Sequence, residues 1–202
     1  MPPSKRDALY QAAIKQDFER LKSLAAAYPE ALNALDSFGE PLLESVTASL
    51  SEETELKHRG RVVEFLIAAG ADPNQLGDEG TSALTAAILA MDSELLEVLL
   101  NAGADPNLPS GFFNRQTLYD WAVMDYMHET WTLPRLISTE SSSKNIFLPN
   151  THDSNDENMW LLELDRCAIE AGLRRPDYLF ILRRYGALSF SERQADTLSR
   201  SE

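Results

Sequence analysis

The chain is poor in cysteine and has no long apolar run. Its single cysteine, Cys167, excludes an intramolecular disulfide, and its place in an apolar pattern predicts a buried structural thiol rather than a nucleophile. No stretch approaches the roughly 18 apolar residues that a membrane-spanning helix requires, and no apolar signal-peptide segment follows the first residues. We therefore expect a cytoplasmic protein.

Positive charge is also scarce. The 18 lysines and arginines stand against 32 aspartates and glutamates, which gives a formal net charge of −14. Much of the excess lies in residues 36–107, where 14 acidic residues meet only 3 basic ones. Such a surface repels nucleic acids and anionic membranes. The acidic residues either attract a basic protein partner or simply keep the protein surface solvated.

Residue patterns typical of catalysis are missing. The three histidines, His58, His128 and His152, are far apart and lack the spacing of metal ligands. No glycine-rich phosphate loop occurs, and the carboxylates form no regular pairs that would predict general acid–base chemistry. We therefore expect no enzymatic activity, no cofactor and no metal site.

A repeated phrase dominates what is present. Residues 62–74 and 95–107 both read as an apolar helix followed by Gly-Ala-Asp-Pro-Asn, and Gly70 lies 33 residues before Gly103. A glycine in this position ends a helix in the left-handed conformation, and the Asp and Asn after it favour a turn. Leucine, valine and alanine at helical spacing predict helices that are buried against neighbouring copies.

This phrase resembles the ankyrin repeat, which has a period of 33 residues and a first helix that opens on a Thr-Pro-Leu-His-like turn. Residues 82–85 (Ser-Ala-Leu-Thr) match that turn, and residues 41–42 keep its Pro-Leu. The resemblance covers about residues 6–188. It implies an all-α solenoid of stacked helix-turn-helix units with projecting hairpin loops, and it implies the binding of a protein partner.

Four repeats are expected within one domain of residues 1–190. Their boundaries fall at about residues 6–35, 36–76, 77–110 and 111–188. The fourth repeat is interrupted by an insertion of about residues 130–157, which is rich in Ser, Thr, Asn and Asp. Helical pattern resumes at Met159 and again at Asp177, and the polar residues 191–202 predict a frayed C-terminal tail.

In the ankyrin family, partners contact the tips of the loops and the exposed side of each first helix. The corresponding residues of this chain are Phe38, Glu40, Asp78, Glu79, Thr81, Phe112, Phe113, Arg115 and Met124. The adjacent Phe112 and Phe113, beside Arg115, have the composition of a binding hot spot. The alternative is a structural role, in which they cover the insertion or cap Trp121.

Small size, acidity and an irregular repeat array resemble the features of bacterial immunity proteins, which block toxins made by neighbouring cells. This similarity favours a monomeric module that captures one specific protein, a basic one by charge, and inhibits it. The alternative is a scaffold, an adaptor or a secreted effector that recruits a partner without inhibiting it.

Overall fold

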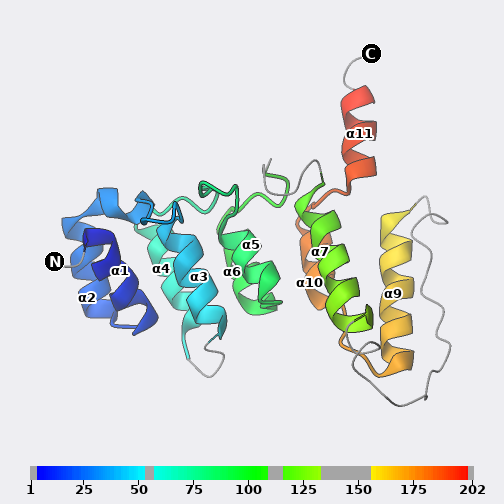
Figure 1. Cartoon of the computed structure of the whole chain (residues 1–202), viewed down its shortest axis with the longest axis horizontal. Helices are drawn as coiled ribbons and strands as arrows, with labels where there is room; N and C mark the ends of the chain where they lie inside the picture. Colours follow the sequence, from blue (N-terminus) through cyan, green and yellow to red (C-terminus); the bar gives the residue numbers. More distant parts are fainter. Residues whose placement is uncertain (1–3, 53–56, 109–115, 133–155, 200–202) are drawn as a thin grey trace. The chain divides into compact units, whose positions relative to one another are not determined.

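The computed structural model describes residues 4–52, 57–108, 116–132 and 156–199 (Figure 1). Within these ranges the chain is helical and forms no strand, which confirms the expected helical class. The chain divides into two compact units, Met1–Arg115 and Gln116–Glu202. The expectation of a single domain over residues 1–190 stays a prediction. None of the helices in the described ranges is long and apolar enough to cross a membrane.

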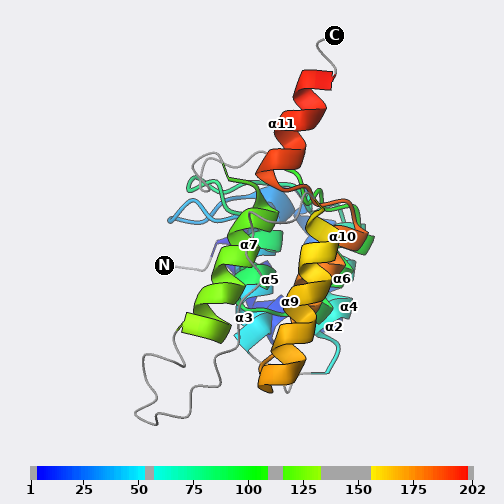
Figure 2. The ribbon, with the colours of Figure 1, turned by 90° about the vertical axis from the view of Figure 1, so that its right-hand side faces the viewer.

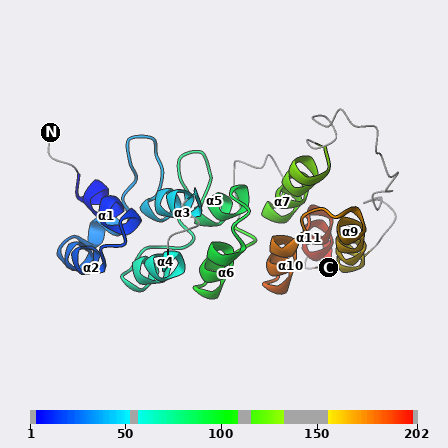
Figure 3. The same cartoon turned by 90° about the horizontal axis from the view of Figure 1, so that it is seen from below.

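The first unit consists of pairs of helices joined by loops. Its elements are α1 (Lys5–Ile14), α2 (Phe18–Ala27), η1 (Pro29–Asn33), α3 (Leu42–Glu52), α4 (Arg59–Ala68), α5 (Ala83–Leu89) and α6 (Ser93–Asn101). The first helices of the pairs, α1, α3 and α5, lie in one row, and the second helices, α2, α4 and α6, lie in another (Figure 3). Within the rows, α3 packs against both α1 and α5, and α4 packs against α6.

Short polar side chains begin several of these helices. The side chains of Ser4 and Ser82 accept hydrogen bonds from the backbone amides of Asp7 and Thr85, three residues later. The side chains of Asp7 and Thr85 in turn accept from the backbone amides of the two serines. Asp17 and Asp92 accept from the third residue of α2 and of α6. The core between the helix pairs is made of fully buried aliphatic side chains, among them Leu9, Leu42, Leu66, Ile88 and Leu96.

Asparagine side chains connect successive helix pairs at the ends of the second helices. Asn33 donates to the carbonyl of Gly70 (2.9 Å) and accepts from the amide two residues after that glycine (2.8 Å). Asn74 makes the same two bonds with Gly103 (3.2 Å) and with the amide two residues after it (2.7 Å). Both glycines have positive φ angles, +115° and +95°, which confirms the predicted left-handed helix ends.

The second unit contains α7 (Leu118–Met127), the π-helical turn η2 (His128–Thr132), α9 (Glu157–Ala171), α10 (Asp177–Arg184) and α11 (Phe190–Ser199). The helices predicted from Met159 and from Asp177 are thus present as α9 and α10. Buried tyrosines join them to α7, because Tyr178 donates to the carbonyl of Ala122 (3.1 Å) and Tyr126 donates to that of Arg174. Cys167 is buried on α9, as expected, and burial raises the pKa of its thiol. Most of the predicted insertion, residues 133–155, lies outside the described residues.

The expected frayed tail is wrong for residues 191–199, which belong to α11 (Figure 2). Arg183 forms two hydrogen bonds to the carboxylate of Glu192, at 2.6 and 2.8 Å. The same carboxylate accepts from the amide of Ser189 (2.8 Å), and the amide of Phe190 donates to Asp120 (2.9 Å). A polar helix is therefore anchored at its start by side chains from α10 and α7, a long-range effect that composition does not reveal.

Candidate partner-binding surface

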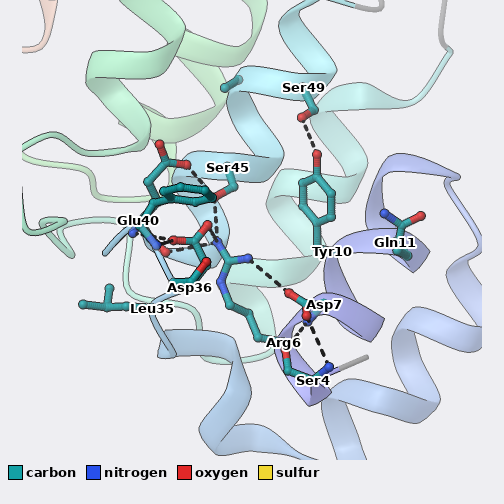
Figure 4. A pocket seen from close by; sticks show the side chains of 13 residues that line it. Ser4, Arg6, Asp7, Tyr10, Gln11, Leu35, Asp36, Glu40, Ser45 and Ser49 are labelled. Carbon is teal, nitrogen blue, oxygen red and sulfur yellow. Dashed lines mark hydrogen bonds and ion pairs between the residues drawn. The ribbon is translucent and has the colours of Figure 1, made fainter. Parts of the chain in front are cut away.

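A hollow of about 690 Å³ opens in the first unit between α1, the start of α3 and the loop that joins η1 to α3 (Figure 4). We call this loop, residues 34–41, the first loop. Its ends are joined by an antiparallel bridge between Leu35 and Pro41. The lining is mixed, with apolar side chains from Leu35 and Phe38, polar groups from Tyr10, and carboxylates from the loop.

Arg6 is the residue that connects the elements around this hollow. Its side chain is 7% exposed and comes from the first turn of α1. The guanidinium donates to the carbonyls of Ala34 (3.3 Å) and Glu40 (3.0 Å) and to the hydroxyl of Ser45 (2.6 Å). It also forms an ion pair with Asp36 at 3.2 Å (Figure 4). One arginine therefore fixes both ends of the first loop to α1 and α3.

Asp36 completes the internal bonding of the first loop. Its carboxylate accepts from the amides of Phe38 (2.8 Å) and Glu40 (3.0 Å). Desolvation disfavours the charged form, but these two hydrogen bonds and the charge of Arg6 outweigh it and lower the pKa of Asp36. Asp36 thus stays charged, with one carboxylate oxygen bonded to loop amides and the other paired with Arg6.

Phe38 lies at the tip of this fixed loop with its side chain 81% exposed. Gly39 follows it with a φ of +80°, a conformation that favours glycine. A large aromatic side chain held in water on an ordered loop is unusual, since burial of such a group is worth about 2 kcal/mol or more. The Phe38 side chain is therefore held in solvent and is not part of the core.

A second loop, residues 69–82 between α4 and α5, lies against the first. The amide of Asp78 donates to the carbonyl of Gly39 (3.0 Å). A Cβ atom on Gly39 would lie only 2.3 Å from the Asp78 carboxylate, so glycine is also required for this close approach. The second loop closes on itself through a hydrogen bond from the amide of Gly77 to the carbonyl of Thr81 (2.9 Å).

Glu44, on α3, is buried beneath the two loops. Its side-chain atom Oε2 has no hydrogen-bond partner among the residues that the structure describes. Desolvation raises the pKa of Glu44; a hydrogen bond from Thr81 opposes the rise, and the negative charges of Glu40 and Asp36 add to it. Ionisation of Glu44 is therefore unfavourable, because the side chain is buried and lies close to the carboxylates of the first loop.

The structure brings together five of the nine residues that the sequence predicts for partner binding. Phe38 and Glu40 line the hollow, Asp78 and Glu79 are exposed on the second loop, and Thr81 is partly buried beside Glu44. Met124 is 52% exposed on α7 and belongs to the second unit. Phe112, Phe113 and Arg115 lie outside the described residues, so their binding and structural roles both stay predictions.

Sequence reasoning missed Arg6 and Tyr10, which shape the hollow. Tyr10 shares a hydrogen bond of 2.8 Å with Ser49 of α3 and so ties the two first helices together. A signal for Arg6 exists in the sequence, because it precedes Leu9 by three residues and Ala13 by seven, on the buried stripe of the helix. A charged residue on an apolar stripe indicates a buried ion pair.

No family model matches this chain. Within the described ranges, no group of three or more His, Cys, Asp or Glu side chains is placed to hold a metal ion. The polar groups of the hollow are bonded mainly to one another, and its exposed lining includes the aromatic ring of Phe38, the side chain of Leu35 and the carboxylate of Glu40.

Proposed function

We propose that this chain is an ankyrin-type solenoid that captures one specific protein and inhibits it. The observation that carries the proposal is Phe38, which is 81% exposed on a loop that hydrogen bonds hold in place. Exposed aromatic side chains on rigid supports are typical centres of protein interfaces, because little conformational entropy is lost when they are buried.

The repeated junctions support the ankyrin-type assignment. Asn33 and Asn74 bond in the same way to glycines that are 33 residues apart, which is the ankyrin period. In such an array, each loop projects beside the row of first helices and the two together form a binding face. The hollow lies in that position, between α1, α3 and the first loop.

Charge supports a protein of basic surface as the partner. The whole chain carries a formal net charge of −14, and the exposed tips of both loops are acidic at Glu40, Asp78 and Glu79. Complementary charge accelerates association and disfavours wrong partners. An inhibitor that acts by occlusion needs this kind of rapid and selective capture.

The proposal is tested by capture and inhibition. The purified chain is used to isolate its partner from cells that produce it, and the partner's activity is then measured with the chain in excess. We expect loss of that activity, and we expect Phe38→Ala to weaken binding about 30-fold, which corresponds to roughly 2 kcal/mol.

Met159→Ala is the matched control, since Met159 is 60% exposed on α9 of the second unit. It removes a similar apolar side chain and is expected to leave binding unchanged. A captured partner that stays fully active would contradict inhibition and favour an adaptor. Equal binding by wild-type chain and Phe38→Ala would contradict the binding face.

A further inference from the structure

From the charge and bonding of the hollow, and resting on the proposed function, we infer that the hollow receives an arginine side chain from a basic segment of the partner. Its volume, about 690 Å³, lies within the roughly 300–1,000 Å³ that ligand pockets occupy.

The hollow does not suit an anion, although Arg6 lies in it. The donors of that guanidinium are directed at two loop carbonyls, at the Ser45 hydroxyl and at Asp36. Asp7, Asp36 and Glu40 bring three carboxylates to the same lining, and among the described residues that line it Arg6 is the one cation. The local charge is therefore negative, and its arginine is already neutralised by the protein.

Glu40 is the carboxylate best placed to meet an incoming cation. The two oxygens of Asp36 are occupied by loop amides and by Arg6. Glu40 is exposed, and within the described ranges its side chain is bonded only through Oε2, to the Ser45 hydroxyl at 3.2 Å. Figure 4 shows the Glu40 side chain near Ser45 and above Arg6. A carboxylate of this kind accepts a guanidinium through two parallel hydrogen bonds.

The aromatic ring selects arginine over lysine. Phe38 belongs to the same lining and is 81% exposed, so its ring face is open to stacking by a planar guanidinium that enters the hollow. The aliphatic stem of the arginine finds apolar lining in Leu35, which is 40% exposed. A lysine ammonium is more strongly hydrated and neither stacks nor bonds in a fork.

The probe for this inference is a tripeptide, acetyl-Gly-Arg-Gly-amide, titrated into the isotope-labelled full chain and followed by NMR. We expect saturable shifts of the backbone amides of the first loop and of the first turns of α1. The same peptide with citrulline, a neutral isostere of arginine, should bind at least tenfold more weakly, and the lysine peptide several-fold more weakly.

Two variants and one matched control localise the binding. Glu40→Gln and Phe38→Ala should each weaken the arginine peptide at least fivefold. Glu64→Gln removes the same charge from an exposed position on α4 and should leave the affinity within twofold of wild type. Circular dichroism of each variant establishes that the helices are retained.

Several results would overturn the inference. Shifts that spread over the acidic surface, equal weakening by Glu40→Gln and Glu64→Gln, or equal binding of citrulline or lysine peptides would each do so. Failure here is distinct from failure of the proposed function. A partner that is captured and inhibited through Phe38, without peptide binding at the hollow, removes only the arginine assignment. Peptide binding at the hollow without any inhibited partner removes the proposed function.

Discussion

Replacing Arg6 by methionine should destabilise the first unit strongly, because the apolar stem is kept while every polar contact of the guanidinium is lost. Arg6 is 7% exposed and its partner Asp36 is 18% exposed, so the pair is largely shielded from water. Removing one member of a buried pair leaves an uncompensated charge and costs about 3–5 kcal/mol. We expect about 3 kcal/mol, since Asp36 keeps its two amide donors.

Urea denaturation followed by far-UV circular dichroism measures this effect. Circular dichroism is used because the three tryptophans, Trp121, Trp131 and Trp160, all belong to the second unit, where their fluorescence reports first on that unit. For a slope of about 2 kcal/mol per molar urea, a loss of 3 kcal/mol lowers the midpoint by roughly 1.5 M.

Arg20→Met is the matched control for this experiment, because Arg20 is exposed on α2. It should change the free energy of unfolding by no more than about 0.5 kcal/mol. If Arg6→Met stays within the same limit, the first loop is not held by Arg6, and the account of the hollow is refuted.

Three further changes test other contacts. Asn74→Ala removes two hydrogen bonds at a repeat junction and should cost about 1–2 kcal/mol in urea denaturation; no loss would contradict the role of the junction. Arg59→Met breaks buried contacts to Asp92 and to the Leu50 carbonyl and should cost about 3 kcal/mol, whereas an effect below 1 kcal/mol would contradict them. For Glu44 the folded-state pKa is raised, so its stabilising contribution is complete below the ordinary value of 4.5 and is lost as the pH rises through the raised pKa. Between pH 4 and pH 7 the wild type should therefore lose unfolding free energy relative to Glu44→Gln, which carries no titrating group at this position. A difference between the two proteins that does not change with pH would contradict this expectation.

Local signals made much of the helical structure predictable. Gly70 and Gly103 occupy helix ends that require a positive φ, a demand that glycine itself reveals in the sequence. The apolar patterns of α9 and α10 were likewise sufficient to locate these helices, because each buries one side of the helix. The period of 33 residues predicted the matching junctions without naming the asparagines that form them.

The contacts that build the hollow could not be predicted in the same way. Arg6 meets Asp36 and Ser45 across 30 and 39 residues, and Asp78 meets Gly39 across another 39. Such contacts depend on the register between neighbouring helix pairs, which a periodic pattern does not encode. The sequence nevertheless located Phe38 and Glu40 on an exposed loop, since loop tips are exposed whatever the register; their contact with a partner stays a prediction.

Two arginines that are buried in the described part of the chain explain how its acidic helix pairs stay together while the loops remain acidic. Arg6 joins α1 to the first loop, and Arg59 joins the start of α4 to the start of α6 through Asp92 and Glu94. Each neutralises carboxylates at a junction between helix pairs, where like charges would otherwise repel. No such partner is present for Glu40 within the described ranges, since its carboxylate is bonded only to a serine hydroxyl. Within the described ranges, negative charge is therefore compensated at these junctions and left uncompensated at Glu40, an arrangement that would favour the basic partner we propose.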